Sequence, residues 1–195
     1  MRNKKMSFHD LSRKQLSKDS FGAFIEEITA QSDRACALVA AASLDNILKN
    51  ILVTEFFHLD ESEIEAMFDA NNAMLSSFSN KIVLAHALSC ITDEDKGDLS
   101  IIRRIRNVFA HTAVNIDFDT DVISNECIKL KAFENIFDGP RERCSPRQLF
   151  MGAALHLYLR LMKKSVHDYE LLNQATRDVI KKLGVDAPAK RRGRP

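Results

Sequence analysis

The residues best able to do chemistry lie in the stretch 98–111 and are Arg106, Asn107 and His111. A guanidinium can stabilise the negative charge that develops on a phosphoryl group, and an imidazole can transfer a proton near neutral pH. On an ideal helix Arg106 and His111 lie about 140° apart, so they could face one phosphate only if the helix end tightens or a second subunit completes the site. Asn107 and His111 are four residues apart and therefore neighbours, so Asn107 could orient the imidazole.

A structural interpretation of the same residues is also open. Arg106 could pair with a carboxylate inside the fold. His111 could cap the C-terminal end of its helix, where a cation is favoured. Spacing alone does not decide between a catalytic pair and two structural residues.

The spacing Arg106-x4-His111, with a polar residue directly after the Arg, resembles the motif of the HEPN superfamily. Members of this superfamily are all-helical domains in which the Arg and His act in metal-independent RNA cleavage. The resemblance implies a toxin-like ribonuclease with Arg106, Asn107 and His111 at a site between two subunits, and no cofactor or metal.

The helix that carries these residues is predicted to have two unlike faces. Its apolar arc requires a core and consists of Ile101, Ile102, Ile105, Val108 and Phe109. Its polar arc is suited to anions and consists of Arg103, Arg104, Asn107 and His111. We expect Arg103 and Arg104 to be available to a nucleic acid. Arg103, Asn107 and His111 follow one another at four-residue spacing and therefore line up along one side of the helix. Such a row would serve a protein interface as readily as an active site.

Apolar residues recur at three- and four-residue steps along most of the chain and predict further helices around this one. The expected helices cover residues 21–29, 32–57, 61–69, 76–89, 93–111, 121–133 and 146–182, with a short extended segment at 114–118. Ser32, a capping box at Thr92–Asp95 and the pair Ser145-Pro146 mark three helix starts. We therefore predict an all-α protein with a single helical-bundle domain over residues 19–183.

Composition narrows the class of protein further. Of 195 residues 45% are hydrophobic, so most of the chain should fold, and the scarcity of Pro (4) and Gly (6) favours helices. The four cysteines form no CxxC pair, and no histidine has a carboxylate at metal-ligand spacing, so we expect no metal site and no disulfide framework. Without an apolar run of about 18 residues or a signal peptide, the sequence predicts a cytoplasmic protein with no membrane contact.

Charge is concentrated at the two ends of the chain, although the net charge is only +1. The arm 1–18 and the last 15 residues each carry six Lys or Arg and one Asp, which leaves the middle of the chain acidic. Such blocks are typical of interaction tails, with solubility as the equally weighted alternative. Within the basic tail 184–195, the last six residues resemble an AT-hook, which implies contact with the minor groove of A·T-rich DNA. They are Lys190, Arg191, Arg192, Gly193, Arg194 and Pro195.

Four blocks of sequence, in order, resemble the mannitol operon repressor (MtlR-like) family. They are Ser32–Leu48, Leu75–Leu88, Asp98–His111 and Phe118–Ile123. The resemblance implies an all-helical transcriptional regulator of the repressor type, acting through a protein partner or a homodimer. We favour this function, with the tail adding weak contact to DNA. The alternatives are the HEPN-type ribonuclease, with RNA as its substrate, and a helical scaffold without chemistry.

Overall fold

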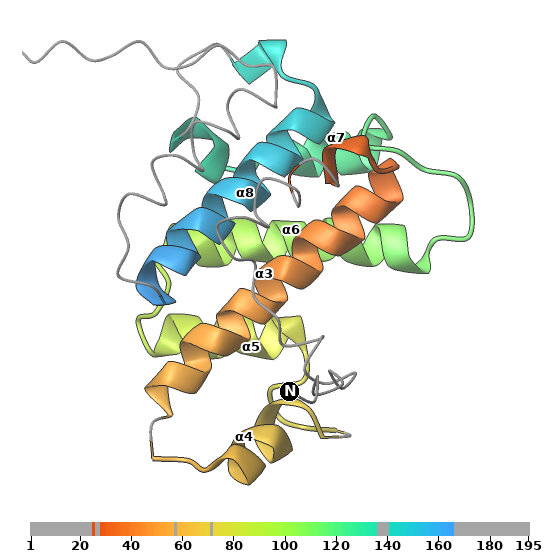
Figure 1. The fold of residues 1–195 in the computed structure, drawn as a ribbon. Coiled ribbons are helices and arrows are strands. Elements are labelled where there is room, and N and C mark those ends of the chain that lie inside the picture. Colours follow the sequence, from red (N-terminus) through yellow and green to blue (C-terminus); the bar gives the residue numbers. More distant parts are fainter. Residues whose placement is uncertain (1–24, 26–27, 57, 71, 136–140, 166–195) are drawn as a thin grey trace, which may run out of the picture.

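The computed structural model describes residue 25 and residues 28–56, 58–70, 72–135 and 141–165. These residues form a bundle of helices, and no strand occurs among them, which confirms the all-α prediction (Figure 1). The α-helices are α3 (Asp33–Glu55), α4 (Glu61–Phe68), α5 (Phe78–Ala87), α6 (Asp93–His111), α7 (Asp121–Cys127) and α8 (Pro146–Ser165). Two 3₁₀ turns, η1 (Ala132–Asn135) and η2 (Arg141–Arg143), precede α8.

Helix α3 lies at the centre of the bundle and packs against α5, α6 and α8 (Figure 1). It begins where expected, because the hydroxyl oxygen of Ser32 accepts a hydrogen bond from the backbone N–H of Ala35 at 3.3 Å. Small residues at the contact, Ala37, Ala40 and Ala41, are buried and allow the neighbouring backbones to approach closely. Leucine and isoleucine at three- and four-residue steps fill the rest of its buried side.

Helices α5 and α6 form a hairpin whose turns follow the sequence signals. Ser77 caps α5, with its hydroxyl 3.1 Å from the N–H of Asn80. Ser89, with φ 59°, ends the helix in the left-handed region. The predicted capping box is confirmed: Thr92 accepts from the N–H of Asp95, whose carboxylate accepts from the N–H of Thr92 at 3.0 Å.

The predicted start of α8 at Ser145-Pro146 is also confirmed, since the carbonyl of Ser145 accepts from the N–H of Leu149. Between Leu149 and Leu161 only His156 and Arg160 are not fully buried. The predicted continuation to residue 182 and the predicted Asp138–Pro140 turn lie outside the described residues, as do the arm 1–18 and the basic tail.

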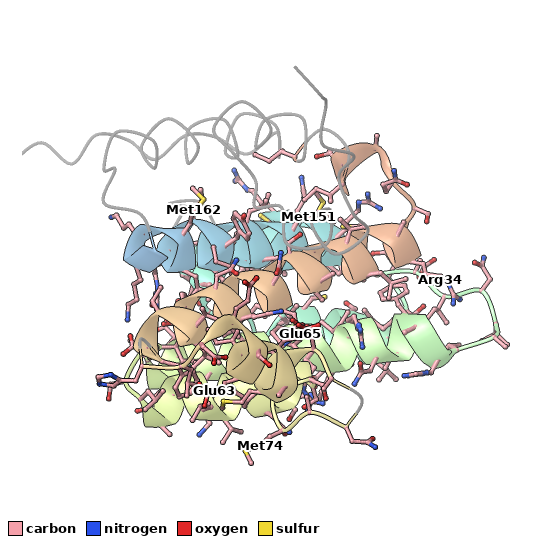
Figure 2. All side chains as sticks on the ribbon, turned by 60° about the horizontal axis from the view of Figure 1, so that its bottom comes forward. Arg34, Glu63, Glu65, Met74, Met151 and Met162 are labelled. Atoms are coloured by element: carbon pink, nitrogen blue, oxygen red, sulfur yellow. The ribbon has the colours of Figure 1, made fainter. Side chains whose placement is uncertain are left out.

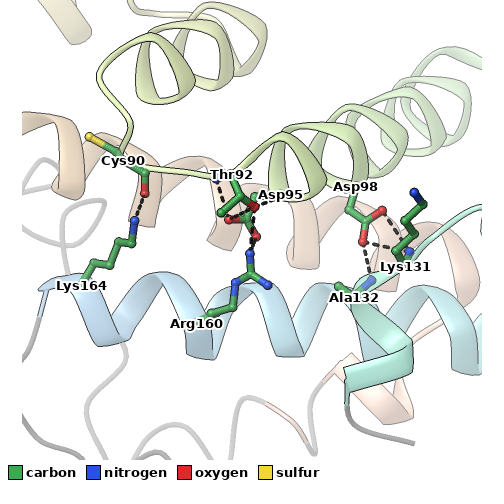
Figure 3. Close-up of polar contacts among 8 residues, drawn as sticks. All are labelled: Cys90, Thr92, Asp95, Asp98, Lys131, Ala132, Arg160 and Lys164. Atoms are coloured by element: carbon green, nitrogen blue, oxygen red, sulfur yellow. Dashed lines mark hydrogen bonds and ion pairs between the residues drawn. The ribbon is translucent and has the colours of Figure 1, made fainter.

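One predicted helix was too long. The helix starting at Asp121 ends at Cys127 rather than at residue 133, because the chain turns toward α6. There the buried carboxylate of Asp98 accepts hydrogen bonds from the N–H groups of Lys131 and Ala132 (Figure 3). Residues 114–118 pair with no strand among the described residues; the N–H of Phe118 donates instead to Asp33 at 2.8 Å.

One valine predicted to be buried, Val108, is exposed. Its side chain is 40% exposed because it lies at the edge of the apolar arc. In α5, Val83 is also exposed (58%), on the side away from the contacts that the helix makes with α3 and α6 among the described elements. The remaining members of the α6 arc, including Ile102, Ile105 and Phe109, are buried as predicted.

The sequence-based expectation of no segment long and apolar enough to span a bilayer needs one correction. Helix α3 meets that length and composition criterion, with half of its apolar window buried inside the protein. Its charged residues Asp45 and Lys49 both form ion pairs with other elements. These contacts are those of the core helix of a helical bundle.

Candidate functional site

The end of α6 is a regular α-helix through His111. The N–H of Thr112 donates to the carbonyl of Val108 at 3.0 Å, a four-residue step that continues the helical hydrogen-bond ladder. The helix end therefore does not tighten in the way that would bring Arg106 and His111 to one face. Within one chain the half-buried Arg106 and the exposed His111 point in different directions.

The guanidinium of Arg106 has an amide as its partner. Its Nη1 donates to Oδ1 of Asn107 at 2.9 Å. Among the described residues no carboxylate pairs with Arg106, so the structural interpretation of this arginine as half of an internal ion pair stays a prediction. Asn107 orients Arg106, its neighbour in sequence, rather than the imidazole of His111.

The C-terminal end of α6 is capped by Arg34 of α3, which the sequence analysis did not identify. Nη1 of Arg34 donates to the carbonyls of Phe109 (2.7 Å) and Thr112 (2.9 Å), and its Nη2 donates to that of Val114 (3.1 Å). Figure 2 shows Arg34 beside the loop that follows α6. Because Arg34 holds these carbonyls, His111 is not needed as the cap and remains exposed.

The polar side of α6 carries the half-buried Arg103 and Asn107 and the exposed His111. Within the part of the chain that the structure describes, neither Arg103 nor His111 has a hydrogen-bond or ion-pair partner. Arg104 differs, because it forms an ion pair with Glu126 of α7 at 2.5 Å. Hydrogen bonds from Lys129 and Arg104 lower the pKa of Glu126, so this carboxylate stays charged and holds Arg104 against α7.

A groove with a volume of about 540 Å³ lies against α3, and Arg106 of α6 forms part of its wall. We refer to it as the Arg106 groove. Two ion pairs cross it: Lys81 of α5 to Asp45 of α3 at 2.7 Å, and Lys49 of α3 to Asp69 after α4 at 2.5 Å. Apolar wall is supplied by residues that include Val39, Phe68 and Phe78.

Contacts between α6 and its neighbours fix the position of the helix (Figure 3). Asp95, 4% exposed, forms an ion pair with Arg160 of α8. Lys164 of α8 donates to the carbonyl of Cys90, just before α6, at 2.5 Å. Burial raises the pKa of Asp98, which acts as an acceptor for two backbone amides.

Burial shifts the pKa values of two cysteines and one histidine away from those needed for chemistry near neutral pH. Burial raises the pKa of Cys36 to about 11 and that of Cys127 to about 12, so neither thiol is a ready nucleophile. Burial also lowers the pKa of His156 to about 4, which keeps its ring neutral. No group of three His, Cys, Asp or Glu within the described residues could hold a metal ion.

Comparisons with known proteins give one structural likeness. No family model matches the chain, and no curated protein matches it. The fold is similar to a chain in the X-ray structure of the MtlR-HPr complex from Escherichia coli, with a TM-score of 0.49 and 17% identity. The match covers 85% of this chain and 99% of that one. At this level of identity and superposition, the likeness assigns no function to the chain.

Proposed function

We propose that the protein is an MtlR-like transcriptional regulator that acts through contacts of its helical domain with a second copy or a protein partner. The observation that carries the proposal is one side of α6, where the half-buried Arg103 and the exposed His111 have no partners among the described residues. The exposed side chain of Val108 borders this side of the helix, three residues before His111. An arginine with an exposed apolar group nearby is typical of protein interfaces.

The sequence resemblance supports the same proposal, because the Asp98–His111 block that resembles the MtlR-like family is the helix that carries this face. Arg103 and Arg104 were both expected to contact nucleic acid. Arg104 forms an ion pair with Glu126, so only Arg103 of the two keeps an uncompensated charge. A single such charge favours a protein contact over a nucleic-acid contact. DNA contact by Lys190–Pro195 rests on the AT-hook resemblance alone.

A transcript comparison in the native host tests the regulator. Deleting the gene should change the transcript level of at least one operon, and expression of the wild-type protein should restore that level. The double variant Arg103→Glu/Val108→Asp should fail to restore it, because it reverses a charge and adds another on the α6 face. Arg143→Glu, an exposed change outside this face, is the control and should behave as wild type. An unchanged transcript profile on deletion would rule out the regulator.

A gel shift tests the tail separately. At low salt, full-length protein should retain an A·T-rich duplex better than protein lacking residues 190–195, since phosphate contacts dominate such binding. If neither form binds the duplex, the tail does not contribute DNA contact and the regulator acts through protein alone.

A metal-independent ribonuclease is the second candidate, and one observation favours it: Arg106 is held by Asn107 and has no carboxylate partner within the described ranges of the chain. A guanidinium in this state could stabilise a phosphoryl group. Because α6 stays regular to its end, His111 would have to come from a second subunit. Expression of wild type beside His111→Ala, with cellular RNA integrity as the measurement, tests the reaction; equally intact RNA would exclude it.

A further inference from the structure

The Arg106 groove has the dimensions of a small-molecule site. Its volume of about 540 Å³ falls within the range of roughly 300–1,000 Å³ that is usual for ligand pockets. The floor is open rather than filled, because α3 presents small residues there, including the exposed Ala42. A larger side chain at this position would occupy the groove.

The charges in the groove do not cancel. Each lysine on its wall is neutralised by an aspartate, in the pairs Lys81–Asp45 and Lys49–Asp69. Arg106 is the fifth charged residue of the wall and has no carboxylate partner among the described residues. The groove therefore carries one uncompensated positive charge, on a half-buried side chain where the effective dielectric constant is lower than in water.

Hydrogen-bonding capacity also remains unused beside that charge. Only Nη1 of Arg106 is engaged, by Asn107, so most of its five N–H donors are free. Asn46 of α3 lines the same groove, and its half-buried amide has no hydrogen bond to any described residue. A planar guanidinium with free donors binds a carboxylate or phosphate group in preference to neutral groups.

The rest of the wall is apolar. Phe68, at the end of α4, is fixed by the ring of Phe56 at a centroid distance of 6.3 Å and by the ammonium of Lys49, which lies 5.8 Å from its centroid. Phe78 begins α5, and Val39 contributes from α3. A ligand that satisfied the whole groove would combine an anionic head with an apolar body.

We propose that the Arg106 groove binds a small organic anion, with its carboxylate or phosphate held by Arg106 and Asn46 and its apolar part against Phe68 and Phe78. The site does not depend on the regulatory function proposed above, because its ligand-binding groups line the groove against α3, whereas the regulatory contact uses Arg103 and His111. It also needs no second subunit, since every group comes from one chain.

Calorimetric titration of the full-length protein tests this site with benzoate, phenyl phosphate, inorganic phosphate and the neutral benzamide. Benzoate or phenyl phosphate should bind with a Kd of about 1 mM or tighter, at least tenfold tighter than benzamide. The tighter of the two identifies the anionic head as carboxylate or phosphate. Phenyl phosphate should also bind more tightly than inorganic phosphate, because only the former has an apolar body to bury.

Two variants report on the groove independently. Arg106→Gln should reduce binding of the anions at least tenfold, to the level of benzamide. Ala42→Leu fills the groove from an exposed position that tolerates a larger side chain, and it should weaken binding of every aromatic probe. Arg143→Gln removes an exposed positive charge outside the groove and should leave all affinities unchanged. Circular dichroism confirms that each variant is folded.

Three results would overturn the proposal. The first is an absence of binding by both aromatic anions at 10 mM, about tenfold above the expected Kd. The second is equal affinity for the anions and benzamide. The third is binding that folded Arg106→Gln and Ala42→Leu both leave unchanged.

Discussion

The Nη1 atom of Arg34 lies 2.7 Å from the carbonyl oxygen of Phe109, so the first turn of α3 holds the last turn of α6. The two residues are 75 positions apart in sequence. This contact fixes where the α6 helix ends, and it therefore fixes the position of His111 relative to Arg106. The bonds from Arg34 to Thr112 and Val114 extend the cap into the following loop.

Replacing Arg34 by Ala should lower the free energy of unfolding by about 3 kcal/mol, because three carbonyls lose a charged donor and two of these bonds are half-buried. Arg34→Lys should recover less than half of that loss, since an ammonium cannot reproduce the guanidinium fork. Urea denaturation measures both. The exposed Arg143→Ala should change stability by less than about 0.5 kcal/mol; a loss at Arg34 no larger than this would show that the cap is dispensable.

The ion pair between Asp95 and Arg160 makes a prediction that only a double variant can test. Arg160→Met leaves the buried carboxylate of Asp95 without its cation and should cost about 3 kcal/mol. Adding Asp95→Asn should recover at least half of this loss, because the uncompensated charge is gone. Denaturation of the four proteins in the cycle gives the coupling free energy. Strictly additive losses would mean that the two side chains do not interact.

His156 predicts how stability changes with pH. Its pKa is about 4 in the folded protein and 6.5 in the reference state, so below pH 6.5 the unfolded chain takes up a proton that the folded chain does not. The contribution of His156 to stability is therefore complete above pH 6.5 and is lost as the pH falls toward 4. Partial solvent exposure limits the loss to about 2 kcal/mol.

The comparison that isolates this effect is wild type against His156→Gln, which cannot titrate. The difference in unfolding free energy between the two should shift against wild type between pH 6.5 and 4 and should stay constant from pH 7 to 8. Parallel pH profiles over the whole range would mean that His156 is protonated equally in both states.

The sequence predicted helix starts that depend on neighbouring residues, but it did not predict contacts between distant segments. Side-chain caps at Ser32 and Thr92 were visible because each cap bonds a residue three positions away. The end of α7 depends instead on the carboxylate of Asp98, more than 30 residues away, which binds the amides that would otherwise continue the helix. No periodicity in residues 121–133 could show this.

The candidate site divides in the same way. The two faces of α6 followed from helical spacing, apart from Val108, which lies at the edge of the apolar arc and is exposed. Arg34 could not be recognised as the cap from the sequence. The carbonyls that it binds are at least 75 positions away, and no local pattern around an arginine in the first turn of a helix indicates such a contact. The Arg106 groove needs α3, α4, α5 and α6 together, and the spacing of Arg106 and His111 gave no indication of it.

The geometry of α6 makes a last prediction about the ribonuclease candidate. If cleavage occurs at all, Arg106 of one subunit must act with His111 of another, because the regular helix keeps them on different faces of one chain. Arg106→Ala and His111→Ala should then each be inactive when expressed alone. Their coexpression should restore RNA cleavage, since a mixed dimer contains one site with both wild-type residues. A site formed within a single chain predicts no restoration, because neither variant chain contains an intact pair. The measurement is RNA integrity in cells that express each variant alone and the two together, at matched protein levels.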